Sequence, residues 1–398
     1  MNEAVNNSKK TLKINILKNC LKIKQLILFV FLIFFLLTLC LTIKFYLTPF
    51  KPIAKTSLAI FKGAAHVHSL YSHDATQTIN NISQDAYQAG LQFIILNDHN
   101  TRMESPRYEH QVLVIPQAEL STQAGHILYL DPNNTEPLRD ETRHLHSNFK
   151  YSLTDQILSI AAHPYSRYTP FDTDYLNMTH GYEVLSSSSD FYNILYSWRL
   201  LFFLGYYGNS PFALTALYSK RDRSVDAYQQ VLNQRPYLLF CGTDDHGFIQ
   251  HPARLKTYEI YLPTFIPEKT ALTDSQQVIK ILKEGQYFCA LGLLGDASAL
   301  SISLHHENLI LPLGTRAKIP STLHVHWNNK DIPKGYKVVV YHQGQVFFTS
   351  HDSHIKQVLN EIGNYRVEIS IEIPDLLFGT RELTFIYTNP FYLEPEIL

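Results

Sequence analysis

Side chains that can hold a metal ion stand repeatedly at the ends of short apolar runs in this sequence. His66 and His68 follow one such run, and Asp244 and His246 follow another. Residues two positions apart on a β-strand point to the same face, so each pair can direct two ligands toward one ion. The full set at such ends is His66, His68, Asp98, His99, Glu119, His163, Asp244 and His246.

The chemistry of this set favours a metal-dependent site. A mixture of imidazole and carboxylate ligands suits Zn, Mn or Fe better than Ca or Mg, which prefer oxygen ligands alone. The chain has 19 histidines, but that count alone decides little. Each residue on its own is also compatible with a core or surface role, and only the shared placement after separate apolar runs favours a site.

The elements that must position these residues alternate between strand and helix over residues 59–297. Ile79, Ile82 and Ala86 have helical spacing, and Gly90 follows as a C-cap residue. Apolar runs of strand length precede the candidate ligands. In a parallel α/β barrel the carboxyl ends of the strands meet on one face, where ligands distant in sequence can come together. Residues of about 190–235 break this rhythm and predict a helical insertion that packs on the core, covers the site or touches lipid.

Residues 298–398 have a different sequence pattern, in which short runs of alternating apolar and polar residues are separated by turn residues. This spacing is typical of an all-β sandwich. The predicted strands are Leu309–Leu313, Leu323–Trp327, Lys337–Tyr341, Val346–Thr349, Tyr365–Ile373 and Leu383–Tyr387.

The order of the motifs resembles the PHP (polymerase and histidinol phosphatase) superfamily. The resemblance covers about residues 60–296. It is carried by His66-Val67-His68-Ser69-Leu70-Tyr71-Ser72-His73-Asp74, Asn97-Asp98-His99-Asn100, Ala118-Glu119-Leu120-Ser121, Ala162-His163-Pro164 and Gly242-Thr243-Asp244-Asp245-His246-Gly247. It implies a distorted (β/α)7 barrel of TIM-like type, two or three bound metal ions and phosphoesterase activity. The C-terminal part resembles a sandwich appended to some such enzymes.

The same resemblance implies how the ligands are shared. One ion would be held by His66, His68, Glu119 and Asp244. A second would be held by His99, His246 and Asp74. Glu119 would bridge to a third ion, which His163 and His126 would also hold. Many members of the family have Ser-Asp-Gly where this chain has Ser72-His73-Asp74-Ala75, so His73 and Asp74 both stay open as the ligand, with Asp74 favoured.

The catalytic roles follow from these ligands. Clustered ions lower the pKa of a shared water and neutralise phosphate oxygens, so the resulting hydroxide would attack phosphorus in line. Asp74 or Asp98 would take the proton, and Asp98 would orient a ligand or a water. Arginine matches phosphate bidentately. The arginines near ligand loops are Arg102, Arg107, Arg167 and Arg254, of which Arg102 is the first choice; each is also compatible with solvated surface charge.

A membrane-spanning helix is predicted near the N-terminus, within residues 25–46. Leu26 to Ile43 contains no charged residue, and the segment before it is rich in lysine. Lysine concentrates on the cytoplasmic side, so residues 1–24 would form a cytoplasmic tail and the catalytic part would lie outside the cytoplasm, which means the periplasm if the cell is Gram-negative. A cleaved signal peptide is the competing interpretation. Residues 47–58 would form a linker.

Composition limits the partners. With 34 basic and 35 acidic residues, the chain lacks the excess of positive charge that nucleic-acid binding needs. A small phosphorylated substrate and the membrane are the expected partners. The four cysteines form no C-x-x-C pair and read as buried or membrane residues, although a Cys241–Cys289 bridge stays open because both are placed outside the cytoplasm. The alternatives are hydrolysis of a carbon ester, amide or carbamate, and a non-catalytic metal-holding envelope-binding module.

Overall fold

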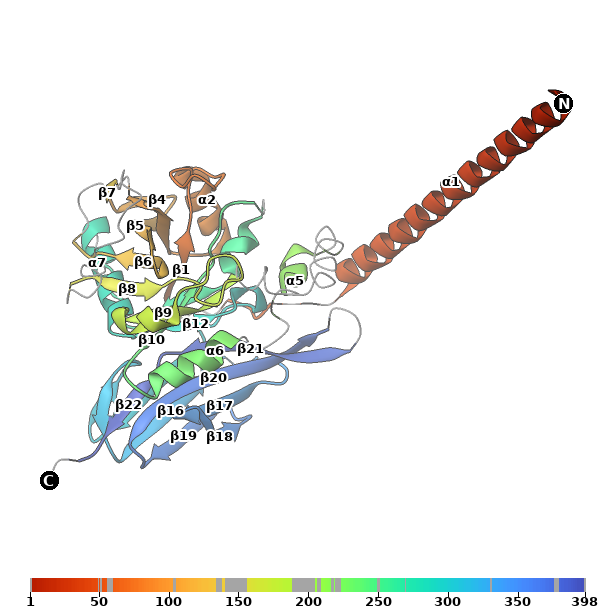
Figure 1. Cartoon of the computed structure of the whole chain (residues 1–398). Coiled ribbons are helices and arrows are strands. Elements are labelled where there is room, and N and C mark those ends of the chain that lie inside the picture. The colour runs from red at the N-terminus through yellow and green to blue at the C-terminus, as the bar shows by residue number, and fades with distance from the viewer. Residues whose placement is uncertain are drawn as a thin grey trace.

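The computed structural model shows a long N-terminal helix, an α/β part and a C-terminal β part (Figure 1). It describes residues 2–48, 50, 52–55, 60–102, 105–133, 138–139, 156–187, 205, 209–215, 218, 223–248, 251–268, 270–329, 331–375 and 379–396. Much of the predicted insertion at about 190–235 lies outside these residues. Its described helices are α5 (Ser210–Leu214) and α6 (Arg223–Leu232).

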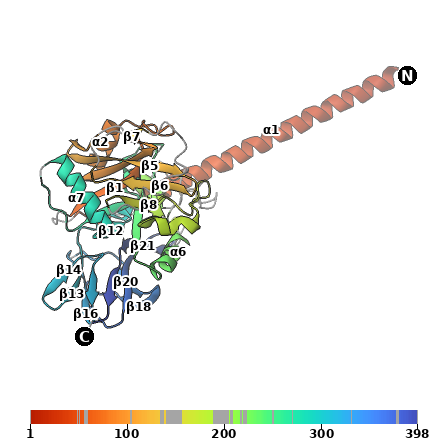
Figure 2. The ribbon, with the colours of Figure 1, turned by 60° about the vertical axis from the view of Figure 1, so that its left-hand side comes forward.

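Helix α1 (Asn2–Leu47) projects from the body of the protein (Figures 1 and 2). Its stretch Lys18–Leu47 is long and apolar enough to cross a membrane, and an 18-residue window within it has a mean hydropathy of 3.1. Large apolar side chains along this stretch are exposed, whereas Leu41 and Phe45 are buried. The Phe45 ring lies 5.2 Å from that of Phe212 in α5, so the body covers only the last turns of the helix.

The chain after α1 contacts the body within a few residues. Ile53 donates a backbone hydrogen bond to Leu294, and its carbonyl accepts one from Asp296 (2.8 and 3.0 Å). This part of the predicted linker therefore lies against the body.

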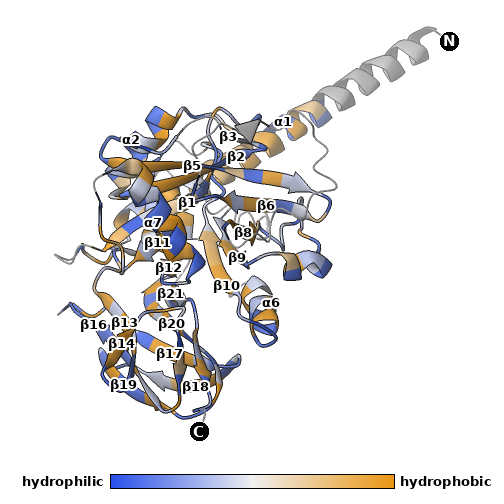
Figure 3. Ribbon diagram, turned by 90° about the vertical axis from the view of Figure 1, so that its left-hand side faces the viewer, coloured by the Kyte–Doolittle hydropathy of each residue, from blue (hydrophilic) through white to orange (hydrophobic). Residues whose placement is uncertain are grey.

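The first part of the large sheet follows the alternation predicted from the sequence. Strands β1 (Phe61–Val67), β2 (Phe93–His99) and β5 (Val112–Thr122) are parallel neighbours. Between β1 and β2 lies the predicted helix α2 (Ile79–Ala89), which ends as predicted at Gly90, in the left-handed conformation (φ 78°). Thr78 caps its N-terminus, a role that was not predicted from the sequence. Strand β4 (Arg107–Glu109) pairs with β5, and the short β3 (Thr101–Arg102) with β7 (Leu138–Arg139). Figure 3 shows the apolar character of β1, β2 and β5.

Further strands extend the sheet on both sides. Beyond β5 come β6 (Gly125–Leu130), β8 (Leu158–Ala161), β9 (Gly181–Ser186) and β10 (Leu238–Gly242). On the other side of β1 lie β11 (Glu259–Leu262) and β12 (Phe288–Ala290). Helix α7 (Ala271–Lys283) connects these two strands, and short 3-10 helices lie at η3 (Thr173–Met178), η5 (Pro252–Lys256) and η6 (Gly292–Leu294).

The predicted (β/α)7 barrel is not confirmed, because the strand order does not close on itself among the described residues. Strand β11 pairs antiparallel with β1 and occupies the side where a closing strand would lie. The segment after β10 does reach β1 through backbone hydrogen bonds, from Thr243 to Ala65 (2.9 Å) and from Asp245 to His66 (3.2 Å). His68 N also donates to the Asp245 carbonyl (2.9 Å), so Asp245 forms an isolated parallel bridge with Val67 and not a strand ladder. The fold shown is a mixed α/β fold with an open sheet.

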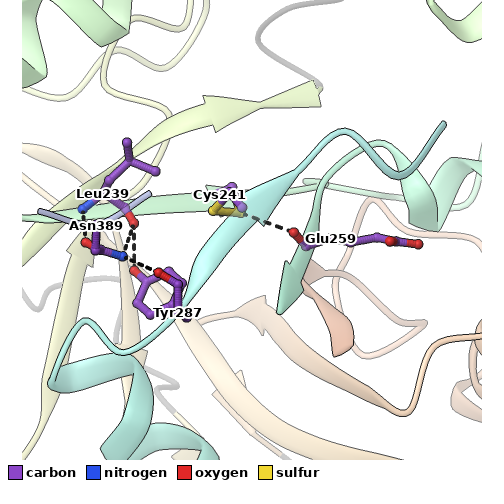
Figure 4. The surroundings of a disulfide bond; sticks show 6 residues. Leu239, Cys241, Glu259, Tyr287 and Asn389 are labelled. Atoms are coloured by element: carbon purple, nitrogen blue, oxygen red, sulfur yellow. Dashed lines mark hydrogen bonds between the residues drawn. A yellow bond between two sulfur atoms is a disulfide. The ribbon is translucent and has the colours of Figure 1, made fainter. Parts of the chain in front are cut away.

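A disulfide bond between Cys241 and Cys289 joins β10 to β12 (Figure 4). The Asn389 side chain connects the same strands: its Oδ1 accepts from Leu239 N (2.9 Å), and its Nδ2 donates to the carbonyls of Leu239 and Tyr287. The bridge that the sequence left open is thus present, and these two cysteines are not isolated thiols.

The C-terminal part consists of two sheets that share one apolar core. Strands β21 (Thr380–Thr388), β20 (Gly363–Pro374), β17 (Lys337–His342) and β18 (Gln345–Ser350) continue the large sheet beyond β12. Beside them, β15 (Arg316–Lys318) pairs with β22 (Phe391–Glu394). The separate antiparallel sheet has the order β14 (Leu309–Leu311), β13 (Leu300–His306), β16 (Ser321–Trp327) and β19 (His354–Leu359). Every strand predicted in this part overlaps an observed strand.

Candidate metal centre

The predicted ligands leave the ends of different strands with unusual backbone geometry. His66 lies in β1, His163 follows β8 and Asp244 follows β10, with φ of 59°, 28° and 48°. Positive φ is costly for residues other than glycine, and such strain gathers at functional sites. His99 and Glu119 are register partners on the parallel strands β2 and β5, so these two side chains start side by side.

Glu119 is the centre of the arrangement and is fully buried. Five histidines approach its carboxylate within 3.5 Å, of which His68 Nε2 is the most distant, at 3.5 Å. His126 Nδ1 lies 2.9 Å, His99 Nδ1 3.0 Å, His163 Nε2 3.1 Å and His66 Nε2 3.4 Å from a carboxylate oxygen. These residues come from four different strands or strand ends. The predicted convergence of distant residues therefore occurs, and it includes His126.

Asp244 and Asp74 complete the arrangement. Asp244 Oδ1 lies 3.4 Å from Nε2 of both His66 and His68, and 3.6 Å from His246 Nδ1. Asp74 Oδ2 lies 3.3 Å from His99 Nε2 and 3.4 Å from His246 Nε2.

The position of His73 differs from that of Asp74. Its side chain is 79% exposed, and its Nε2 lies 3.8 Å from Asp74. Of the two residues that the sequence left open, Asp74 is therefore the one placed between two candidate ligands.

Four overlapping groups of these residues have ligand atoms within 4.8 Å of one another. They are His68–His99–His246, His66–Glu119–His163, His66–His68–Asp244 and His99–Glu119–His126. Within the described part of the chain, the buried Nε2 atoms of His66 and His68 make no hydrogen bond. A buried polar atom without a partner is costly, and a cation would satisfy both nitrogens. The residues present thus fit a metal ion.

Glu183 is a buried residue of this site that sequence reasoning missed. Its Oε1 lies 2.8 Å from His66 Nδ1, and its Oε2 accepts a hydrogen bond from the His163 backbone (2.9 Å). A carboxylate on Nδ1 leaves Nε2 of His66 for a metal. The signal was a charged residue within an apolar run, Gly181–Ser186. A Cβ at Gly242 would collide with Glu183 and with His66, so only glycine fits there.

Asp98 contacts a candidate ligand through another side chain. Its carboxylate accepts hydrogen bonds from Ser69 N (2.6 Å), Ser69 Oγ (2.8 Å) and Ser72 Oγ (3.1 Å). Ser72 Oγ in turn lies 3.0 Å from His68 Nδ1. Asp98 is thus connected to His68 through Ser72, as expected of a residue that orients a ligand.

The protonation states favour metal binding at some candidate ligands and oppose it at others. In spite of burial, which acts to lower them, the pKa values of His66 and His163 are raised above the usual value by nearby carboxylates, so these two histidines must release a proton before they can bind an ion. Burial alone would raise the pKa of Glu119, but the charge of His66 and the hydrogen bonds from His126 and His163 hold that pKa well below its usual range. Burial lowers the pKa of His68 to about 3. Burial also acts to lower the pKa of His163, but the bond to Glu119 and nearby carboxylates outweigh it and raise that pKa to about 9. Neutral His68 and ionised Glu119 are the forms that bind metals.

The arginines near the ligand loops have different surroundings. Arg254 pairs with Asp85 (2.6 Å) and Asp245 (2.8 Å), and Arg107 pairs with Glu109 (2.7 Å). Arg102 is buried, which lowers its pKa, and the negative charge of Asp131 acts in the opposite direction. Arg167 is exposed. Arg254 and Arg107 are therefore neutralised by carboxylates of the chain itself.

Comparison with known proteins adds no relative. No protein-family model matches the sequence, and no curated protein matches it.

Replacing Glu183 by glutamine is expected to weaken metal binding by about 10- to 100-fold, the usual effect of changing a residue that orients a ligand. The amide keeps the shape but loses the charge that holds His66. Competition with a chromophoric chelator measures the zinc affinity, and thermal unfolding of the metal-free protein checks the fold. Glu307→Gln, at an exposed turn, is the control. Equal zinc affinity in Glu183→Gln and the unmodified protein would show that Glu183 does not act on the ligands.

Proposed function

We propose that this chain is a membrane-anchored, metal-dependent hydrolase of PHP type whose substrate is a phosphate ester. The observation that carries the proposal is the gathering of imidazoles around the buried carboxylate of Glu119 and the partly exposed one of Asp244, in four groups that share members. Shared members are what a centre of two or three ions requires, because neighbouring ions are bridged by common ligands. The mixed nitrogen and oxygen donors favour Zn, Mn or Fe.

In the proposed hydrolysis, Asp74 and Asp98 have different roles. Bound divalent ions supply a water of lowered pKa and neutralise charge on the phosphate. Hydrolysis forms a bond from the water oxygen to phosphorus, breaks the ester P–O bond and delivers a proton to the departing alcohol. Asp74 is the candidate proton acceptor, because its side chain is 37% exposed and lies beside His99 and His246. Asp98 already accepts three hydrogen bonds and positions His68 through Ser72.

We further propose that α1 crosses the membrane, with the body outside the cytoplasm. Support comes from the apolar stretch Lys18–Leu47 and from the lysines that precede its uncharged part. The disulfide between Cys241 and Cys289 supports the same orientation, because such bonds persist in oxidising compartments.

Hydrolysis of a carbon ester, amide or carbamate is the second candidate. The observation that favours it is the pairing of Arg254 with Asp85 and Asp245, and of Arg107 with Glu109. Arginines neutralised in this way are poor clamps for a phosphate dianion. The same ions would polarise a carbonyl oxygen.

A substrate screen separates the two candidates. The full-length protein in detergent, loaded with Zn, Mn or Fe, is offered 4-nitrophenyl phosphate, bis(4-nitrophenyl) phosphate and 4-nitrophenyl acetate. We expect turnover of at least one phosphate ester. His66→Ala and Asp244→Ala are each expected to lower it by about 10³-fold, which corresponds to about 4 kcal/mol of lost transition-state stabilisation.

Circular dichroism establishes that both variants are folded. Turnover of the acetate alone would replace the phosphoesterase proposal by the second candidate. Unchanged phosphate turnover in both folded variants would remove this centre from the reaction.

A further inference from the structure

Large apolar side chains are exposed on the same loops that supply the metal ligands. Phe248 is 69% and Leu70 55% exposed, each two residues after a candidate ligand, His246 and His68 respectively. Tyr71 is 46% exposed in the same loop as Leu70. Single exposed apolar residues are common on protein surfaces and need no explanation. A group of them beside a buried polar centre is unusual, and such groups mark binding sites.

Tyr168 is a further exposed aromatic residue, on a third loop that follows a candidate ligand, His163. It is 63% exposed. We call the four residues Leu70, Tyr71, Tyr168 and Phe248 the apolar rim.

The loops that carry Leu70 and Phe248 are tied to each other by hydrogen bonds. Thr76 N donates to the carbonyl of His246 (3.1 Å), and Thr76 Oγ1 donates to that of Gly247 (3.0 Å). Leu70 N donates to Gln77 O within its own loop (2.8 Å). The loops therefore hold Leu70 and Phe248 in place before any ligand binds.

Arg254 holds the same two loops from the buried side. It donates to the Gln77 side chain of one loop (3.1 Å) and to Asp245 of the other (2.8 Å). Preorganised contacts of this kind raise affinity, since little ordering is left to occur on binding.

The Phe248 ring lies beside the ring of the candidate ligand His246. The two rings are nearly parallel, with an interplanar angle of 7° and centroids 6.1 Å apart. A ligand group held by the ions would place its next few atoms beside this ring. An apolar group there would cover Phe248 and Leu70, whereas a hydroxylated group would leave them in water.

From this geometry we infer that the substrate carries an apolar group directly beside the bond that is cleaved, and that the apolar rim recognises it. This inference rests on the proposed hydrolase function and narrows its substrate class. The occupant is an ester whose alcohol part is aromatic or alkyl, not a sugar or another polyol. Covering one large apolar side chain is expected to change affinity by about tenfold or more.

Binding of phosphonates to the zinc-loaded, full-length protein tests the inference by calorimetry, without relying on turnover. We expect phenylphosphonate and butylphosphonate to bind at least about tenfold more tightly than methylphosphonate. Phe248→Ser should remove most of this preference, measured as the ratio of the phenylphosphonate affinity to the methylphosphonate affinity of the same variant. Ile266→Ser, which alters a 70% exposed residue elsewhere, is the matched control and should keep the preference. A preference for phenyl over butyl would identify ring stacking as the contact.

Hydroxamates provide a second set of probes that bind metal ions without a phosphate. If phosphonates fail to bind but benzohydroxamate binds about tenfold more tightly than acetohydroxamate, the rim is supported and the phosphoesterase proposal fails. If phosphonates bind with no preference for an apolar group, the phosphoesterase proposal survives and the rim is overturned. A preference for apolar phosphonates that persists in the Leu70→Ser, Phe248→Ser double variant also overturns the inference. The same holds if the double variant keeps the preference and differs from the unmodified protein only in its partition into lipid vesicles.

Discussion

Replacing Glu119 by glutamine is expected to remove most of the bound metal and to lower the turnover of the protein by about 10³-fold. Glu119 is the one carboxylate that His66, His99, His126 and His163 all approach within 3.4 Å. The amide keeps nearly the same volume but removes the negative charge that would be shared between ions. A loss of about 4 kcal/mol corresponds to this factor and is reasonable for a charge facing divalent cations. Metal content by elemental analysis and turnover of the best screened ester measure the two effects.

The control for this prediction is Glu307→Gln, at an exposed turn between β13 and β14. It carries the same chemical change far from the candidate ligands in the sequence and should leave both quantities unaltered. Because Glu119 is buried among histidines, removing its negative charge also changes the stability of the metal-free protein. Thermal unfolding without metal must therefore accompany the assay. A folded Glu119→Gln variant with full metal content would contradict the central place of this residue.

Removing the disulfide by the double change Cys241→Ala, Cys289→Ala is expected to lower the free energy of unfolding by about 4 kcal/mol. The bridge closes a loop with a sequence separation of 48. In the chain-entropy account, a loop of this length restricts the unfolded chain by roughly that amount at 25 °C. Urea unfolding of the full-length protein in detergent, followed by circular dichroism, measures the change. An unchanged urea midpoint would show that the bond contributes nothing to stability.

The same cysteines report on the compartment of the body. PEG-maleimide added to denatured, unreduced protein from intact membranes should modify Cys20 and Cys40 but not Cys241 or Cys289. After reduction, all of them should react. Reactive Cys241 and Cys289 before reduction would argue that the body lies in a reducing compartment, and would overturn the proposed orientation.

Most residues of the candidate site could be predicted because they end recognisable apolar runs, whereas Asp74 and His126 were included only through the resemblance to the PHP superfamily. His66, Glu119, His163 and Asp244 stand at such positions, and the strand arrangement brings them together. Local features were equally readable from the sequence, such as helix α2, where apolar spacing and the C-terminal glycine agree. These features depend on neighbours in the chain, which the sequence displays directly.

Other features depend on pairings between distant segments and could not be read. Glu183 supports His66 only because β9 lies beside β10, whose end meets β1. Arg254 follows a ligand loop in sequence, yet its partner Asp85 is 169 residues away. The open sheet has the same origin, because nothing in the local pattern of β11 indicates that it runs antiparallel to β1.

The metal content of the protein tests the central claim most directly. The full-length protein is purified in detergent without chelators, and bound Zn, Mn and Fe are counted per chain, with X-ray absorption used to identify their ligands. We predict two or three ions per chain, with nitrogen and oxygen ligands at about 2.0–2.2 Å for zinc, and loss of these ions in Asp244→Ala. Protein that is folded, holds no stoichiometric metal and takes up none on dialysis against these ions would contradict the account.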